Sequence, residues 1–240
     1  MVSGERKKIL IIEDEPKIVR LLKINLESVG YEVAYALNAS DGCKAVEKEM
    51  PDLIVLDVML PDGDGYSLCR RIREFSDVPV IMLTARARER EKIEGFESGA
   101  DDYVTKPFST AELIARVRAI LKRAGAQHPS GAPAELEVDD LRISFSKRKV
   151  YRGATEIRLT HTEYNLLYHL AVNAGKVMLH EELLSLVWGP EYRDEVEYLR
   201  AYIRHLRKKI EVDPSEPRII VSSPGIGYCF ALPTGHEPET

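Results

Sequence analysis

Charged and hydroxyl side chains follow four apolar runs in the first half of the chain. They are Glu13, Asp14, Asp57, Thr84 and Lys106. If these runs are strands of one parallel sheet, their carboxyl ends lie together and the five side chains meet. Three carboxylates this close repel one another unless a hard cation lies between them, and carboxylate oxygens suit Mg²⁺. A phosphoryl group could then bind opposite: Lys106 would neutralise its oxygens, Thr84 would donate a hydrogen bond and an aspartate oxygen would attack in line.

A second set of candidate residues lies on one basic segment of the second half. Residues 199–210 contain no acidic residue and five cations: Arg200, Arg204, Arg207, Lys208 and Lys209. At about 100° per residue, four of the cations share one helix face, and apolar residues form a separate stripe. Such a helix fits the major groove of DNA in a helix-turn-helix protein. A solvated helix surface and a protein-binding winged helix are the alternatives, and only DNA binding should depend strongly on salt.

The pattern before residue 124 supplies elements that can position the first set. Five apolar runs, each followed by a helical pattern, predict an α/β fold with a doubly wound, five-stranded parallel sheet over residues 8–123. Leu53–Leu56 and Val78–Leu83 are apolar almost continuously. This is typical of central strands that are covered on both faces.

A linker and a different kind of domain follow. Residues 124–134, AGAQHPSGAPA, carry no charge and no large aliphatic side chain, which is typical of a linker. Residues 135–232 then run from short strands to three helices and a closing hairpin, which predicts a separate α+β domain. Thr160 and Glu163 predict a capping box at the start of its first helix, and Pro224, Gly225 and Gly227 predict the hairpin turn.

Composition excludes several classes of protein. The chain is 44% hydrophobic and 30% charged, which is typical of globular proteins rather than disordered ones. Cys43, Cys69 and Cys229 form no CxxC and the six histidines form no ligand pair, so we expect a reduced compartment and no zinc site. No apolar run approaches the roughly 20 residues of a membrane span. We therefore expect a cytoplasmic protein that has no membrane partner.

Net charge by itself argues against a nucleic-acid partner. The 34 Lys and Arg residues against 39 Asp and Glu residues give −5. Neither half of the chain is basic overall. The cations of residues 199–210 are nevertheless concentrated in one helix, so the average charge does not describe the surface that DNA would meet.

Four motifs of the first domain occur in a characteristic order: IIEDE, PDLIVLDVMLPDGDG, VPVIMLTA and GADDYVTKPF. Residues 8–123 thereby resemble the receiver domain of two-component response regulators. The resemblance implies that a sensor histidine kinase phosphorylates Asp57, that Lys106 contacts the phosphate and that Thr84 and Tyr103 are switch residues. It also implies a cis peptide bond before Pro107. The implied Mg²⁺ ligands are Asp14, Asp57 and the backbone carbonyl of Met59, with Glu13 reaching the ion directly or through water.

An aspartyl phosphatase is the enzymatic alternative. Such enzymes commonly need a second aspartate two residues after the nucleophile, and Met59 occupies that position. We therefore expect that the protein is not an enzyme.

Motifs of the second domain also occur in order, among them LTHTEYNLLYHLAVNAGKV, YLRAYIRHLRKKIE and PGIGYCF. Residues 135–232 resemble the winged-helix effector domain of OmpR/PhoB transcription factors. The implied DNA-contacting residues are Arg200, Tyr202, Arg204, His205, Arg207 and Lys208. Of these, Arg204, Arg207 and Lys208 suit phosphates, whereas Arg200 or His205 suits base edges.

Three local features refine this resemblance. Several relatives carry an Arg in the wing where this chain has Pro224, which argues against a wing cation in the minor groove. The loop Gly189–Asp194 corresponds to a segment that contacts RNA polymerase in some relatives, and Trp188 before it is expected to anchor the core. The strings WGPEY and DPSEPR are similar to those of Kdp-type potassium-response regulators, although such strings recur across the family.

The resemblance further implies that phosphorylation pairs two receivers through a charged face. The implied interface residues are Lys92, Glu97, Asp101, Asp102, Glu112, Arg116 and Arg118. Their alternative role is a solvated surface with intrahelical ion pairs. The expected function is a phosphorylation-controlled homodimer that binds tandem half-sites on double-stranded DNA. The alternatives are a regulator that binds DNA without phosphorylation and an adaptor that binds protein.

Overall fold

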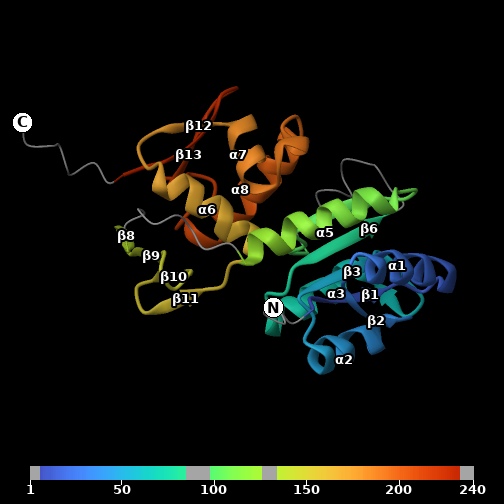
Figure 1. Ribbon diagram of the computed structural model, residues 1–240. Helices are drawn as coiled ribbons and strands as arrows, with labels where there is room; N and C mark the ends of the chain where they lie inside the picture. The colour runs from blue at the N-terminus through green and yellow to red at the C-terminus, as the bar shows by residue number, and fades with distance from the viewer. Residues whose placement is uncertain (1–5, 85–97, 126–133, 233–240) are drawn as a thin grey trace, which may run out of the picture. The chain divides into compact units, whose positions relative to one another are not determined.

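The chain folds into two compact units, Met1–Gly125 and Ala126–Thr240, here called the N-terminal and C-terminal domains (Figure 1). The structure is a computed structural model that describes residues 6–84, 98–125 and 134–232. Helix α5 (Thr110–Gly125) runs two residues into the predicted linker, and the first described element of the C-terminal domain is β8 (Glu135–Val138).

A five-stranded parallel sheet forms the centre of the N-terminal domain. Its strands are β1 (Lys8–Ile12), β2 (Glu32–Ala36), β3 (Leu53–Asp57), β6 (Val80–Thr84) and β7 (Asp102–Thr105). They lie in the order β2-β1-β3-β6-β7, which confirms the predicted doubly wound fold. The register places Ile12 beside Leu56 and Asp57 beside Leu83, so neighbouring strands end at the same edge.

Helices cover both faces of this sheet (Figure 1). They are α1 (Pro16–Ser28), α2 (Ala39–Glu49), α3 (Gly65–Phe75) and α5. The apolar sides of α1 and α5 share one buried cluster with the strands. On the other face, α2 packs so closely that a Cβ at Gly42 would lie 2.8 Å from the Ile12 side chain. A short hairpin, β4 (Met59–Leu60) and β5 (Gly63–Asp64), joins β3 to α3. The predicted fourth helix lies outside the described residues.

The C-terminal domain has two antiparallel sheets and three helices. The first sheet contains β8, β9 (Leu141–Ser144), β10 (Lys149–Arg152) and β11 (Thr155–Ile157). The helices are α6 (His161–Val172), α7 (His180–Val187) and α8 (Val196–Ile210), with a 3-10 turn, η1 (Pro190–Tyr192), before α8. The second sheet contains β12 (Val177–Leu179), β13 (Ile220–Ser223) and β14 (Gly227–Phe230). This arrangement confirms the predicted winged helix.

Two local predictions are also confirmed in this domain. The Thr160 side chain and the Glu163 side chain form the capping box at the start of α6. The apolar stripe of α8 is buried, since Leu199, Ile203 and Leu206 are at most 1% exposed. Among the described residues, no helix combines the length and apolar character that crossing a membrane requires.

Candidate functional site

The carboxyl ends of the central strands bring the predicted chemical groups together. Asp57 and Thr84 are the last residues of β3 and β6, and both are buried. Glu13 is buried just beyond β1, whereas Asp14 beside it is exposed. From the end of β7, the Lys106 Nζ reaches Glu13 Oε2 at 2.7 Å and Asp57 Oδ2 at 2.9 Å. We call these five residues the strand-end site.

The acidic members of this site are close enough to share one cation. Ligand oxygens of Glu13, Asp14 and Asp57 all lie within 4.8 Å of one another. Three carboxylates, two of them buried, form the all-oxygen donor set that hard divalent cations prefer. The residues present therefore fit a magnesium site. Met59, whose backbone carbonyl is the fourth predicted ligand, begins the hairpin that follows β3.

Burial makes Glu13 a weak acid in the metal-free site. Loss of water around its carboxyl and the nearby charge of Asp57 together raise the pKa of Glu13 from 4.5 to about 7, although the Lys106 ammonium opposes the change. A cation that binds here must therefore compete with a proton near neutral pH.

Glu13 is expected to make the stability of the metal-free chain fall as the pH rises. Because the folded pKa lies above the unfolded value, the folded chain holds a proton that the unfolded chain releases. This stabilisation is complete below pH 4.5 and is lost as the pH passes through about 7. Urea unfolding on both sides of this window measures the loss, which should be smaller in Glu13→Gln. An equal loss in both proteins would contradict the prediction.

The backbone that carries Asp57 is packed against the start of α3. The Gly65 N–H donates to the Val58 carbonyl at 2.8 Å. A Cβ at Gly65 would lie 2.2 Å from the Asp57 carbonyl oxygen, which no side chain can occupy. Sequence reasoning missed this glycine, although its position between a turn and a helix was a usable signal.

Gly65→Ala is expected to destabilise the N-terminal domain by about 2 to 3 kcal/mol, because the clash is with backbone rather than a flexible side chain. Urea unfolding measures the change. Gly63→Ala is the matched control, since its Cβ would only touch that of Ala39 at 4.0 Å, and it should stay within about 0.5 kcal/mol of wild type. Equal destabilisation by both substitutions would argue against the close approach at Gly65.

Two further features bear on the predicted switch. The Lys106–Pro107 peptide bond is cis, as expected. Tyr103 lies on β7 with its ring buried, and burial raises the pKa of its hydroxyl well above the ordinary value. Tyr103 is thus enclosed in the domain and stays neutral at physiological pH.

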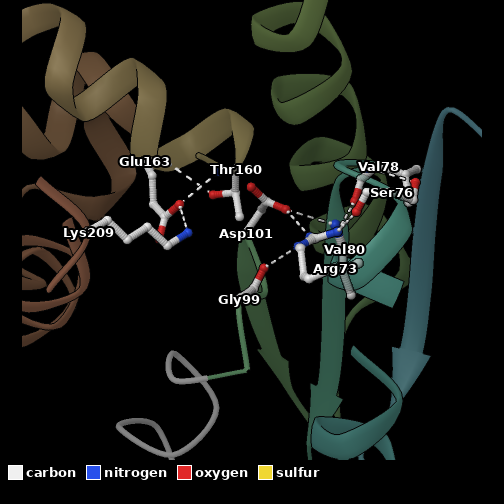
Figure 2. A network of polar contacts seen from close by, with 9 residues as sticks. All are labelled: Arg73, Ser76, Val78, Val80, Gly99, Asp101, Thr160, Glu163 and Lys209. Atoms are coloured by element: carbon white, nitrogen blue, oxygen red, sulfur yellow. Dashed lines mark hydrogen bonds and ion pairs between the residues drawn. The ribbon is translucent and has the colours of Figure 1, made fainter. Parts of the chain in front are cut away.

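Two aspartates of the predicted dimer face are buried in the N-terminal domain. Asp101 Oδ2 accepts hydrogen bonds from Arg73 Nη2 at 2.9 Å and from the Val80 N–H at 3.0 Å (Figure 2). Asp102 is 0% exposed, and its carboxylate pairs with Arg116 at 3.2 Å. Buried carboxylates need partners, and both find them within the domain.

The remaining members of that face divide into two groups. Glu112 and Arg118 are exposed on α5, and Arg116 also pairs with Glu112 at 2.8 Å. Lys92 and Glu97 lie outside the described residues.

The cations of α8 have different surroundings. Arg200, Arg204 and Lys208 are exposed, and His205 is half-buried. Arg200 forms an ion pair with Glu197 one turn earlier. These residues keep the surface position that DNA contact requires.

Arg207, which is half-buried, and Lys209, which is exposed, both make contacts within the C-terminal domain. Arg207 Nη2 donates to the Ile220 carbonyl at 2.6 Å and to Ser222 Oγ at 2.9 Å, which ties α8 to the wing strand β13. Lys209 Nζ lies 2.6 Å from Glu163 Oε2 (Figure 2). Arg207 thus links α8 to the wing, and its predicted phosphate contact stays a prediction.

Tyr202, another predicted DNA contact, lies on the buried side of α8. It is 3% exposed, and its ring packs against Trp188 with centroids 4.9 Å apart. Trp188 is completely buried, which confirms it as a core anchor. Tyr192 of the following loop packs on Tyr198 of α8, so aromatic rings attach this loop to the helix.

Comparisons with known proteins agree with this geometry. Residues 9–118 match the family model of the response regulator receiver domain, and residues 154–230 match that of the C-terminal domain of transcriptional regulatory proteins. The response regulator DrrB of Thermotoga maritima, described as an OmpR/PhoB homolog, is 36% identical over 95% of this chain and 100% of its own, with a TM-score of 0.51. A mutant of the protein RitR is 28% identical over 94% of this chain and 99% of its own, with a TM-score of 0.77.

These matches cover both domains in the same order as the structure. Regulators with a receiver and a DNA-binding domain are typically not enzymes. The chain therefore belongs to the OmpR/PhoB family of two-component response regulators, which regulate transcription.

Proposed function

We propose that a sensor histidine kinase phosphorylates this chain on Asp57 in the presence of Mg²⁺, and that phosphorylation promotes dimerisation and sequence-specific DNA binding. One observation carries the first step. The buried Asp57 carboxylate ends a central strand, 2.9 Å from the Lys106 ammonium and beside two further carboxylates. A nucleophile, a fixed cation and a metal-binding donor set are thus assembled at one point.

The residues have distinct parts in the transfer. An Asp57 oxygen attacks the phosphorus of the phosphohistidine, the P–N bond breaks, and the imidazole nitrogen keeps the electron pair and takes up a proton. Lys106 stabilises the charge on the phosphoryl oxygens, and the Thr84 hydroxyl donates a hydrogen bond. Mg²⁺, held by Glu13, Asp14, Asp57 and the Met59 carbonyl, would neutralise the same oxygens.

The acyl phosphate changes the charge of the site and thereby the surface of the domain. It carries roughly −2 at pH 7, against about −1 for the free carboxylate, and it lies beside Thr84 and on the same sheet as Tyr103. We infer that these two residues reposition and that Glu112, Arg116 and Arg118 join a two-fold interface. Sedimentation of the beryllofluoride-treated chain at tens of micromolar should show a dimer. A monomer would contradict this step.

The C-terminal domains of such a dimer would occupy tandem half-sites about one DNA turn apart. Arg204 and Lys208 would contact phosphates, and Arg200 or His205 would contact base edges. The loop Gly189–Asp194 would contact RNA polymerase. A regulator with these partners works in the cytoplasm, where the chromosome lies.

Genome-wide footprinting of the phosphorylated chain tests the proposal. Paired protected half-sites that weaken without phosphorylation are expected. Equal protection without phosphorylation would indicate a constitutive DNA-binding regulator, and no protection would indicate a protein-binding adaptor. Sites near potassium-transport genes are expected if the similarity to Kdp-type regulators extends to function.

A further inference from the structure

The segment from Val58 to Gly65, here called the β3–α3 loop, is fastened to α3 at its second end. Asp64 accepts hydrogen bonds from the Ser67 N–H and the Ser67 hydroxyl, both at 2.8 Å. The close approach of Gly65 to the Asp57 carbonyl holds the same end. Met59, whose carbonyl is a proposed Mg²⁺ ligand, lies at the other end of this loop.

The tip of the β3–α3 loop is fastened to a different helix. Asp62 Oδ1 accepts from the Ala39 N–H at 2.7 Å, and Asp62 Oδ2 accepts from the Ser40 N–H at 2.9 Å. These are the first two residues of α2, more than 20 positions earlier in the sequence. A carboxylate at a helix N-terminus is favoured by both its hydrogen bonds and the helix dipole.

Asn38 satisfies the next amides of the same helix end. Its side chain accepts from the Asp41 N–H at 2.8 Å, and its carbonyl accepts from the Gly42 N–H at 3.0 Å. The first four amides of α2 are thus divided between Asn38, which belongs to the helix cap, and Asp62, which belongs to the β3–α3 loop. Of these four amide hydrogen bonds, the two to Asp62 are the ones that connect the helix to the loop.

We propose that Asp62 is a positioning residue for the metal site, which fixes the β3–α3 loop so that the Met59 carbonyl faces the cation. The inference rests on the proposed function. Between its two ends the loop is held by a hairpin in which Met59 pairs with Asp64 and Leu60 with Gly63. A hairpin with two-residue strands is marginal by itself. The Asp62 anchor therefore restricts the motion of the carbonyl.

Asp62 remains charged under the conditions in which the site works. The two amide hydrogen bonds hold the pKa of the Asp62 carboxyl below its ordinary value. Groups that hold a metal ligand in place without touching the metal typically change metal affinity 10- to 100-fold when they are removed. Loss of Asp62 should change the Mg²⁺ affinity by an amount near the lower limit of this range, because the three carboxylate ligands are not held by Asp62.

Calorimetric titration of the full, unphosphorylated chain with Mg²⁺ tests the role of Asp62. Asp62→Ala should raise the Kd for Mg²⁺ by about tenfold, and Asp62→Asn, which keeps one acceptor oxygen, should raise it by less. Asn38→Ala is the matched control: it removes a cap from the same helix end, so it should lower Tm about as much as Asp62→Ala does and leave the Kd within about twofold of wild type.

A Kd for Asp62→Ala within about twofold of wild type would overturn the inference. So would an equal loss of affinity in Asn38→Ala, which would point to α2 stability instead. At saturating Mg²⁺, Asp62→Ala should still reach the wild-type extent of phosphorylation by a small-molecule phosphodonor. A wild-type chain that binds no Mg²⁺ would overturn the proposed metal site as well, whereas normal wild-type binding with an unaltered Asp62→Ala overturns only the role of Asp62.

Discussion

Asp57→Asn is expected to abolish phosphorylation of the chain. The amide keeps the shape of the side chain but is not a nucleophile, and it removes one of the two carboxylates that contact Lys106. Loss of an essential nucleophile lowers the rate of group transfer by orders of magnitude. Intact-mass measurement after incubation with Mg²⁺ and a small-molecule phosphodonor should show one added phosphoryl group on the wild type and none on the variant. The rate of phosphorylation should fall by at least about 100-fold.

Asp52→Asn provides a control in the same domain. Asp52 precedes β3, where its carboxylate contacts Lys7 Nζ at 2.6 Å and accepts from the Lys8 N–H at 2.8 Å. Its loss removes an acidic residue close to Asp57 in sequence without touching the strand-end site, so phosphorylation should proceed as in the wild type. A phosphoryl group on Asp57→Asn at the wild-type rate would show that another residue is the acceptor.

Sequence patterns were sufficient for the strand-end site because its geometry follows from topology. In a parallel sheet, the residues at the carboxyl ends of neighbouring strands lie close together, and this proximity does not depend on the conformation of the loops. The apolar runs located those strands well enough to bring Glu13, Asp57 and Lys106 together. The capping box of α6 was equally predictable, since it depends on residues three apart.

Sequence patterns were less informative where a side chain finds its partner far along the chain. The Arg73–Asp101 pair joins residues 28 apart, and the Lys209–Glu163 pair joins residues 46 apart. No local rule distinguishes such an internal charge from one on the surface. Tyr202 differs, because it stands three residues after Leu199 and four before Leu206. That spacing already placed it on the buried stripe.

Two of the five cations of α8 make contacts within the C-terminal domain. Arg207 holds β13 and Lys209 holds the capping box of α6. Arg200, Arg204 and Lys208 remain exposed. With an overall charge of −5, the proposed DNA binding would depend strongly on such local cationic contacts.

Arg204→Ala is therefore expected to weaken DNA binding by about tenfold and to reduce its salt dependence. Each neutralised phosphate contributes about −0.9 to the slope of log affinity against log salt concentration, so losing one contact should make the slope less negative by about that amount per domain. Fluorescence anisotropy with a footprinted operator over a range of salt concentrations measures both quantities. An unchanged slope would mean that Arg204 contacts no phosphate.

Lys209→Ala separates this electrostatic effect from a loss of stability. Both cations lie on α8, but the Lys209 ammonium contacts Glu163 at 2.6 Å and the Arg158 carbonyl at 3.2 Å. Removing it leaves the buried Glu163 carboxylate with one charged partner fewer, which should destabilise the C-terminal domain by about 1 to 3 kcal/mol. Below the unfolding temperature, the slope of log affinity against log salt concentration should match that of the wild type, because the Lys209 ammonium is held by Glu163 and Arg158. If Lys209→Ala lowered the slope as much as Arg204→Ala, both cations would contact DNA, and the internal pairing of Lys209 would have to break on binding.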